Sequence, residues 1–348
     1  MAFRAALEEY MRYKTLLTAT VAALSTSIMA GLSAAHAETP VLTIYTYESF
    51  AAEWGPGPAI EKAFEAKCAC DVNFVALDSS VGILGRVQIE GPSSKADIVL
   101  GLDTSLMATA RSTGLLAPHN VSMAGRSALP VAFDDDVFVP FDWGYFAFVY
   151  NSETLSDVPS SMQALLDAPE DLRIVIQDPR TATPGLGLLL WVKSVYGDDA
   201  AKAWAKLEPK IVTVTKGWWD SYSMFQEGEA DMVLSYSTSP AYHMIVEETD
   251  KYKAADFAEG HYMQIEVAAM LKNAPQPELA AQFMDFILSD DFQSVIPTTN
   301  WMYPAGKAAL PGAFGSLITP STSLLFTPQE VAASKSAWVA EWQAALSQ

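Results

Sequence analysis

After the N-terminal segment, stretches with the hydrophobic pattern of a strand alternate with stretches that have the pattern of a helix. Runs rich in apolar and β-branched residues at 41–47, 71–77 and 96–102 predict three strands. A helix that opens near Pro58 and a second helix over 81–90 lie between these strands. Strands separated by helices pair in parallel through right-handed crossovers, and their ligands bind beyond the carboxyl ends of the strands. The polar residues that follow each strand agree with a ligand site there.

A second α/β unit follows a long β-rich segment. Residues 137–151 predict a strand that crosses from one lobe to another, and residues 262–271 predict the return crossing. Between the two crossings, the pattern predicts a strand, a helix and two further strands at 173–179, 184–197, 211–217 and 230–239. The last third of the chain is predicted to be mainly helical, and its final helix begins with a capping box from Thr327 to Glu330.

The N-terminal segment has the layout of a secretory signal. Arg12 and Lys14 provide a basic start, an apolar run follows, and Ala35-His36-Ala37 is a small-x-small cleavage site. Threonines and serines interrupt the apolar run, which disfavours a membrane anchor, and no other stretch reaches the roughly 18 apolar residues of a membrane span. We expect an exported, soluble protein that is cleaved after Ala37, whether translation starts at Met1 or at Met11.

Length and net charge limit the number of domains and the kinds of partner that we expect for this chain. A chain of 348 residues usually forms two domains, because single cores stop growing beyond about 250–300 residues. The net charge of −20 disfavours nucleic acids and anionic membranes as partners, since both bind Lys and Arg. It would attract cations, or it serves solubility alone. Cys68 and Cys70 are the only cysteines; export permits a disulfide, but this spacing closes a small ring, so the redox state stays open.

Motifs of catalysis and metal binding are missing from the sequence. It contains no GxSxG, HExxH or phosphate-binding GxxxxGK[ST] pattern, and His119, His243 and His261 are scattered. A pair of carboxylates for glycoside hydrolysis depends on spatial geometry and therefore stays open. We predict a protein that is not an enzyme and needs neither a metal nor a cofactor.

Two helix starts share a design. Thr183-Pro184 and Ser239-Pro240 each follow a predicted strand, with the hydroxyl residue as the expected N-cap and proline at the first helical position. Helix starts leave free backbone N–H groups, which bind anions or polar ligands. The alternative is that each is only a cap.

Clusters of aromatic and acidic residues suggest the ligand chemistry. In "KGWWDSYSMF", residues 216–225, Trp218 and Trp219 cannot both face one core, so one of them is a candidate for a surface or a ligand, unless both pack at a bend. Aromatic faces attract organic cations and stack on flat heterocycles, and carboxylates accept hydrogen bonds from amino groups. These clusters therefore favour a flat, cationic small molecule.

Long motifs resemble one family over about residues 41–346. They include "VLTIYTYESFAAEWGPGPAIEKAFEA", "FVPFDWGYFAFVY", "QDPRTATPGLGLLLW", "LSYSTSPAYH" and "NWMYP". They are similar to those of the thiamine-binding periplasmic proteins of ABC transporters. The resemblance implies a two-lobed α/β periplasmic-binding-protein fold of type II, in which each lobe has a mixed, mainly parallel sheet flanked by helices and two crossing strands join the lobes. Lobe 1 would comprise 38–140 and 264–348, and lobe 2 would comprise 141–263.

The implied function is capture of thiamine, thiamine monophosphate or thiamine diphosphate in the periplasm and delivery to an inner-membrane ABC permease, by a protein that is usually a monomer. The implied thiamine-binding residues are Tyr47, Asp78, Ser79, Ser80, Ala182, Thr183, Trp218, Tyr236, Ser237, Thr238, Ser239, Tyr242 and Trp301. Trp218 would face the ligand, which leaves Trp219 for packing or for contact between the lobes.

Three of these positions depart from the family's pattern. Where the family has an acid followed by glycine, this chain has Ser79-Ser80, so either Asp78 substitutes through a shifted backbone or the affinity is lower. Ala182 replaces a residue that is often hydroxylic, so its contact would be through the backbone.

The resemblance leaves three alternatives. Related two-lobed proteins bind ferric iron, typically with neighbouring tyrosines that this chain lacks, or polyamines. An exported enzyme that acts on thiamine or on a glycoside is the third. Thiamine-degrading enzymes of this architecture need a cysteine nucleophile, but Cys68 and Cys70 precede the second strand, at the edge opposite the predicted ligand end.

Overall fold

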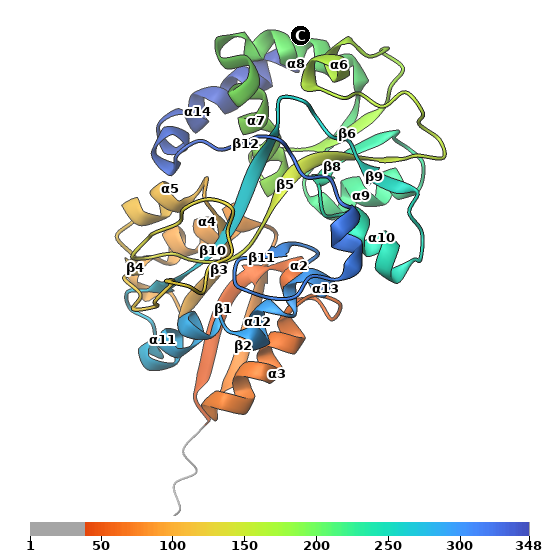
Figure 1. The fold of residues 1–348 in the computed structure, drawn as a ribbon. Helices are drawn as coiled ribbons and strands as arrows, with labels where there is room; N and C mark the ends of the chain where they lie inside the picture. Colours follow the sequence, from red (N-terminus) through yellow and green to blue (C-terminus); the bar gives the residue numbers. More distant parts are fainter. Residues whose placement is uncertain (1–38, 348) are drawn as a thin grey trace, which may run out of the picture. The chain divides into compact units, whose positions relative to one another are not determined.

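Two long antiparallel strands run through the middle of the structure (Figure 1). The computed structural model describes residues 39–347. In it, β5 (Val139–Asn151) pairs with β10 (His261–Leu271) in a register that sets Ile265 opposite Trp143. Almost every residue of both strands is buried, as expected for strands with neighbours along both edges. These are the two crossing strands that the hydrophobic runs predict, and both predictions are confirmed.

On one side of β10 lies the first sheet region, which comprises β1 (Val41–Tyr47), β2 (Asp71–Leu77) and β3 (Ile98–Asp103). In this region β1 lies between β2 and β3 and is parallel to both, whereas β3 pairs antiparallel with β10. The helices α3 (Gly57–Cys68) and α4 (Ser80–Glu90) connect the parallel strands. The predicted alternation of strand and helix is confirmed here.

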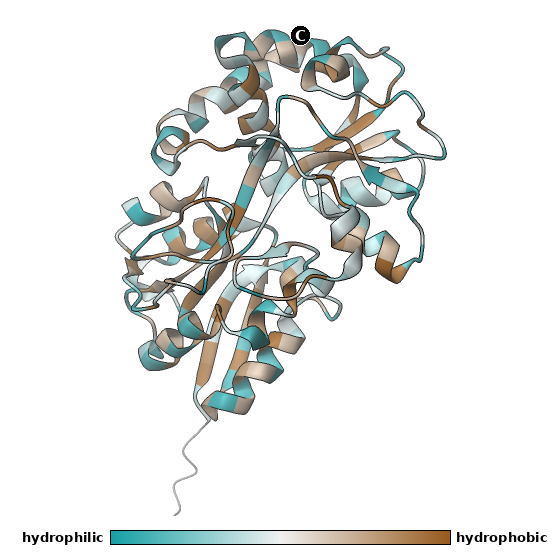
Figure 2. Cartoon of the chain, in the orientation of Figure 1, coloured by the Kyte–Doolittle hydropathy of each residue, from teal (hydrophilic) through white to brown (hydrophobic). Residues whose placement is uncertain are grey.

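On the other side of β5 lies the second sheet region, which comprises β6 (Ile174–Gln177), β7 (Ile211–Thr215) and β8 (Met232–Tyr236). In it β6 is parallel to β7 and β8, and β8 pairs antiparallel with β5. The helix α7 (Thr183–Tyr196) is buried from its second residue through its eleventh, which explains why its sequence is apolar all round rather than on one face. Figure 2 shows hydrophobic residues along the strands of both regions.

Shorter strands and the remaining helices complete the fold. The short strands are β4 (Leu116–Ala117), β9 (Tyr252–Ala254), β11 (Tyr303–Pro304) and β12 (Ser323–Leu324). The remaining α-helices are α2 (Glu48–Ala51), α5 (Met107–Ser112), α6 (Met162–Asp167), α8 (Ala200–Leu207), α9 (Trp218–Gln226), α10 (Pro240–Val246), α11 (Pro277–Phe286), α12 (Asp290–Gln293), α13 (Ile296–Thr299) and α14 (Pro328–Ala345). The 3₁₀ turns are η1 (Gly91–Ser93), η2 (Gly197–Asp199), η3 (Glu208–Lys210) and η4 (Gly312–Ser316).

Two of the predicted helix caps, those of α14 and α7, have different outcomes. At the start of α14, the Glu330 N–H donates to Thr327 Oγ1 at 3.3 Å, and the Thr327 N–H donates to Glu330 Oε2 at 2.8 Å. This confirms the predicted capping box. At the start of α7, Ala182 is the N-cap and Thr183 is the first helical residue, so the predicted Thr183 cap is wrong by one position.

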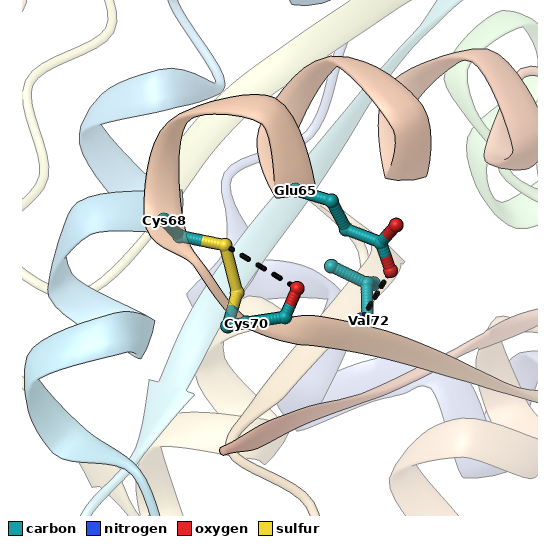
Figure 3. The surroundings of a disulfide bond; sticks show 4 residues. All are labelled: Glu65, Cys68, Cys70 and Val72. Carbon is teal, nitrogen blue, oxygen red and sulfur yellow. Dashed lines mark hydrogen bonds between the residues drawn. A yellow bond between two sulfur atoms is a disulfide. The ribbon is translucent and has the colours of Figure 1, made fainter. Parts of the chain in front are cut away.

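The two cysteines form a disulfide at the end of α3 (Figure 3). Their Cα atoms lie 5.2 Å apart, and Ala69 between them adopts a left-handed conformation with φ of 49°. Beside the disulfide, Glu65 Oε1 accepts the Val72 N–H at 2.9 Å, which ties α3 to the start of β2. The sequence left this redox state open, and in the structure the pair is oxidised.

Two predictions concern membranes and export. Within residues 39–347, no helix is long and apolar enough to cross a membrane. The predicted signal segment and its cleavage after Ala37 lie outside the described residues.

Candidate functional site

Most of the predicted ligand residues lie at or just beyond the carboxyl ends of strands in both sheet regions, with Tyr47 at the end of β1 and Trp218 just beyond β7; Tyr242 lies in α10, and Trp301 follows α13. Two contacts join the turns after these strands. Ser80 Oγ, after β2, lies 3.0 Å from Thr183 Oγ1, at the start of α7. Asp78 in the same turn forms an ion pair with Lys216, just before α9. The structure thus brings the turn after β2 next to the starts of α7 and α9.

The Asp78 carboxylate pairs with Lys216 at the surface of the protein. Its side chain is 61% exposed and that of Lys216 is 69% exposed. The hydrogen bond to Asp78 raises the pKa of Lys216, so the lysine is cationic at neutral pH. A pair this exposed contributes little to stability. Its geometric effect is to bridge the first and second sheet regions, and any role of Asp78 toward a ligand competes with Lys216.

Trp218 is anchored by its polar edge. Its Nε1–H donates to Ser235 Oγ at 2.8 Å, and its ring stacks on Tyr222 with centroids 4.9 Å apart. Ser235 Oγ lies 2.7 Å from Ser239 Oγ, so the end of β8 holds the indole in place. The side chain is half-buried. A held, half-buried indole is suited to stack on a flat ligand.

Its neighbour Trp219 points to a different environment. It is 59% exposed and stacks on Trp54, which is 55% exposed, with centroids 5.9 Å apart and planes 28° apart. Trp54 follows α2 near the first sheet region, whereas Trp219 belongs to α9 of the second. The pair therefore bridges the same two regions as Asp78 and Lys216, in line with the lobe contact that the sequence left for Trp219.

The hydroxyl groups predicted to cap α7 and α10 do not cap them. Neither Thr183 nor Ser239 accepts a side-chain cap hydrogen bond from its helix. Thr183 Oγ1 instead lies against Ser80, and Ser239 Oγ accepts the Tyr236 N–H at 3.2 Å. Ser239 does stand at the N-cap position, but in helical conformation. The predicted position of Ser239 is therefore confirmed, but neither hydroxyl makes the expected cap hydrogen bond: Thr183 contacts Ser80 of a separate turn, and Ser239 bonds within its own turn.

The other predicted residues of the turn after β8, and the N-cap of α7, are buried. Ser237 and Thr238 have no exposed surface, and Ala182 is 3% exposed. Thr238 Oγ1 donates to Met302 Sδ at 3.7 Å, whereas Ser237 Oγ has no hydrogen-bond partner within the described part of the chain. Ser79 is a true N-cap: its Oγ accepts the Gly82 N–H at 3.2 Å at the start of α4.

Tyr242 and Trp301 form a second aromatic contact. Their rings meet edge to face, with centroids 5.3 Å apart. Trp301 has φ of 56°, in the left-handed region that costs an ordinary residue about 1–2 kcal/mol. Such backbone strain is commonest where a side chain must be held for function. The structure thus pairs these two aromatics, from α10 and from the turn after α13.

A buried polar group behind Tyr47 escaped prediction. The Tyr47 hydroxyl donates to Glu266 Oε2 at 2.8 Å, and Asn300 Nδ2 donates to Asp142 Oδ2 at 2.5 Å. Burial, followed by the charges of Glu266 and Asp142, raises the pKa of Tyr47, so its phenol stays protonated. Glu266 and Asn300 were not singled out, although an acid within each apolar crossing strand is a signal that could have found the group.

Two further features are a buried histidine and a cavity that lies away from the predicted ligand residues. Buried His243 lies 2.8 Å from the Tyr222 hydroxyl through Nε2, and burial lowers its pKa, so it is neutral near pH 7. Within residues 39–347, no three His, Cys, Asp or Glu side chains are grouped to hold a metal. A cavity of about 590 Å³ between α5, residues 134–136 and the start of α14 contains none of the predicted ligand residues.

Comparison with known proteins identifies the family. Residues 46–294 match the family model for bacterial extracellular solute-binding proteins. The thiamine-binding periplasmic protein of Escherichia coli strain K12 is 54% identical over 308 residues, which cover 88% of this chain and 94% of that protein. A solved structure described as a periplasmic thiamin binding protein is also 54% identical, has a TM-score of 0.87, and is matched over 90% of this chain and 98% of that chain. The chain belongs to the bacterial extracellular solute-binding protein family.

Within that family it is a member of the thiamine-binding periplasmic protein group. A ferric binding protein from Campylobacter jejuni has a TM-score of 0.75 at 21% identity, over 87% of this chain and 99% of that chain. At that identity the likeness shows the fold alone. The predicted two-lobed type II periplasmic-binding-protein fold, with its mainly parallel sheet and two crossing strands, is confirmed.

Proposed function

We propose that this protein is the solute-binding component of an ABC transporter, that it captures thiamine, and that it delivers thiamine to an inner-membrane permease. The observation that carries the proposal is the 54% identity to the E. coli thiamine-binding periplasmic protein along nearly the whole described chain. The held indole of Trp218 and the Tyr242–Trp301 pair suit a flat, cationic ring system.

The proposed site lies between two lobes, 38–140 with 264–348 and 141–263. Both boundaries fall in or beside the crossing strands β5 and β10, which makes these strands the candidate hinge. The contacts Ser80–Thr183 and Trp54–Trp219 join residues of opposite proposed lobes. They support a closed arrangement in which the turn after β2 faces the starts of α7 and α9.

The proposed ligand residues divide into aromatic walls and hydroxyl groups. Tyr47, Trp218, Tyr236, Tyr242 and Trp301 would contact the rings. Ser79, Ser80, Ala182, Thr183, Ser237, Thr238 and Ser239 would face the hydroxyethyl arm or its phosphates, with Asp78 reaching the aminopyrimidine only if it leaves Lys216. We propose that thiamine, its monophosphate and its diphosphate are all ligands of one monomer.

The proposal also includes export to the periplasm and the absence of catalytic activity on thiamine. The thiamine-binding relatives are periplasmic proteins, and we propose export of this chain with cleavage after Ala37, which the mass of the protein from a periplasmic extract would test. A thiol nucleophile would require a free cysteine, but Cys68 and Cys70 are bonded to each other at the start of β2, the end opposite Tyr47 and Ser80. Prolonged incubation with thiamine is expected to yield no product.

Tryptophan fluorescence distinguishes this proposal from the alternatives. Thiamine should quench Trp218 with a saturable, one-to-one curve, because a cationic ring stacked on an indole alters its emission. Spermidine and ferric citrate, tested at the same concentrations, should give no saturable change. A saturable response to ferric citrate or spermidine but not to thiamine would replace thiamine with that ligand class.

The Trp54–Trp219 stack should stabilise the closed arrangement. Because stacked aromatic pairs contribute about 0.5–1.5 kcal/mol, Trp54→Ala and Trp219→Ala should each weaken thiamine binding by about two- to thirteenfold. The double variant should lose no more than either single variant, because both remove the same contact. Ile89→Ala, at an 89% exposed position on α4, is the control that should not change the affinity. Fully additive losses would show that the two rings act separately.

A further inference from the structure

Two carboxyl groups face each other across the central strand pair. Asp142 of β5 lies opposite Glu266 of β10 in the register, so their side chains lie on the same face of the strand pair. Asp142 has no exposed surface and Glu266 is 6% exposed. Two adjacent carboxylates repel each other strongly when water is excluded, so both cannot be ionised at neutral pH.

The hydrogen bonds around the pair indicate where a proton lies. Glu266 Oε2 accepts from the Tyr47 hydroxyl, and Asp142 Oδ2 accepts from Asn300 Nδ2. Asp142 Oδ1 is buried, and no N–H or O–H donor reaches it from the described residues. A proton on this oxygen would donate to Glu266, which would give every oxygen of Asp142 a hydrogen bond.

None of the groups that face the pair in the described part of the chain supplies a positive charge that would stabilise two ionised carboxylates. The groups that face the pair from other elements are Tyr47 on β1, Asp103 on β3, Tyr236 on β8 and Asn300 after α13. Burial first, and then the charge of Glu266, raises the pKa of Asp142 well above its usual value. Burial also raises the pKa of Glu266, while its hydrogen bond with Tyr47 opposes this rise.

We propose that Asp142 and Glu266 share one proton, and that the single negative charge left on the pair holds the Tyr47 phenol in place and selects a cationic ligand. The pair touches proposed ligand residues from behind. Glu266 bonds Tyr47, Asn300 directly precedes Trp301, and the charge of Glu266 acts on the Tyr236 phenol. Asp142 and Glu266 are therefore positioning residues. The selective part of this proposal rests on the proposed binding of thiamine, which carries a positive thiazolium ring.

The shared proton can be detected without any ligand. Infrared difference spectra of the free protein at pH 7 should contain a protonated carboxyl C=O band that Asp142→Asn removes. The unfolded chain ionises Asp142 above about pH 4, but the folded protein keeps its proton, so folding takes up a proton. The stability that this group contributes is complete below pH 4 and is lost as the pH rises towards its raised pKa. The stability of Asp142→Asn relative to wild type should therefore improve as the pH rises from about 4 to 7.

Amide variants separate charge from shape. In Asp142→Asn or Glu266→Gln, the new amide N–H replaces the shared proton and one carboxylate remains, so each variant keeps the single negative charge. Each should bind thiamine at pH 7 within about threefold of wild type. The double variant D142N/E266Q is neutral, and its preference for thiamine over an analogue with a neutral thiophene in place of the thiazolium should fall about tenfold. E227Q/E229Q removes two carboxyl groups at exposed positions and should leave that preference unchanged.

Each arm can overturn a distinct part of the proposal. No protonated carboxyl band at pH 7, or a band that persists in Asp142→Asn, would exclude the shared proton. An unchanged preference in the double variant would exclude charge selection. If the double variant does not fold, a loss of more than tenfold in either folded single variant would contradict the predicted retention of charge. If wild-type protein binds neither thiamine nor its analogue, the proposed function and the charge selection fail together, while the infrared band still decides whether the proton is shared.

Discussion

Trp218→Ala should weaken thiamine binding by about 1–3 kcal/mol, a loss of roughly 5- to 150-fold, which is the range for removing an aromatic wall from a stacked flat ring. The indole is held by Ser235 Oγ and by the Tyr222 ring, so it is already in position before a ligand arrives. The expected loss therefore reflects ligand contact rather than a change in loop order. Isothermal titration of the variant with thiamine measures it.

Trp218→Phe is the matched control. It retains an aromatic face over Tyr222 but cannot donate to Ser235 Oγ, so it should lose only part of the affinity. The melting temperatures of both variants should be compared with that of wild type, to separate binding from folding. If Trp218→Ala binds thiamine within twofold of wild type, Trp218 is not a ligand residue.

Gly185→Ala should destabilise the protein by about 1–3 kcal/mol, although alanine normally favours a helix over glycine. A Cβ on Gly185 would collide with the Gln177 carbonyl oxygen and would lie 2.7 Å from the Asp178 carbonyl carbon. These are backbone atoms at the end of β6, which cannot move aside as a flexible side chain could. The start of α7 would have to shift, and with it Thr183 and its contact to Ser80. Urea denaturation measures the change in the free energy of unfolding.

Gly85→Ala is the comparison within the same fold. Gly85 lies inside α4, and no atom lies within 4 Å of the position that a Cβ would occupy. Alanine should therefore stabilise the protein by up to about 1 kcal/mol through helix propensity alone. Equal effects of the two substitutions would mean that the close approach of α7 to β6 does not limit stability.

The hydrophobic pattern predicted most strands and helices, because their buried residues recur in short runs along the sequence. The strands of the first sheet region are short apolar runs separated by helices, and the crossing strands are long and almost entirely buried. The capping box of α14 was predictable because all its partners lie within four consecutive residues. Pattern also indicated that Trp218 and Trp219 face different environments.

Contacts between distant residues could not be predicted from pattern. Thr183 looked like an N-cap, but its hydroxyl lies against Ser80, 103 positions earlier in the chain. Asp142 lies beside aromatic residues in the sequence, whereas its partner Glu266 lies on the other crossing strand. Local propensity carries no information about which turn or strand will lie opposite, so these partners appear only in three dimensions.

The most direct test of whether thiamine is the ligand is calorimetric titration of the exported chain, from Glu38 to Gln348, with thiamine. The protein should first be unfolded and refolded, so that no ligand is carried over from the host. We expect tight, one-to-one binding without turnover, and the same experiment with the two phosphates ranks the three ligands. Absence of binding heat, together with unchanged tryptophan fluorescence, would contradict the assignment of thiamine as the ligand.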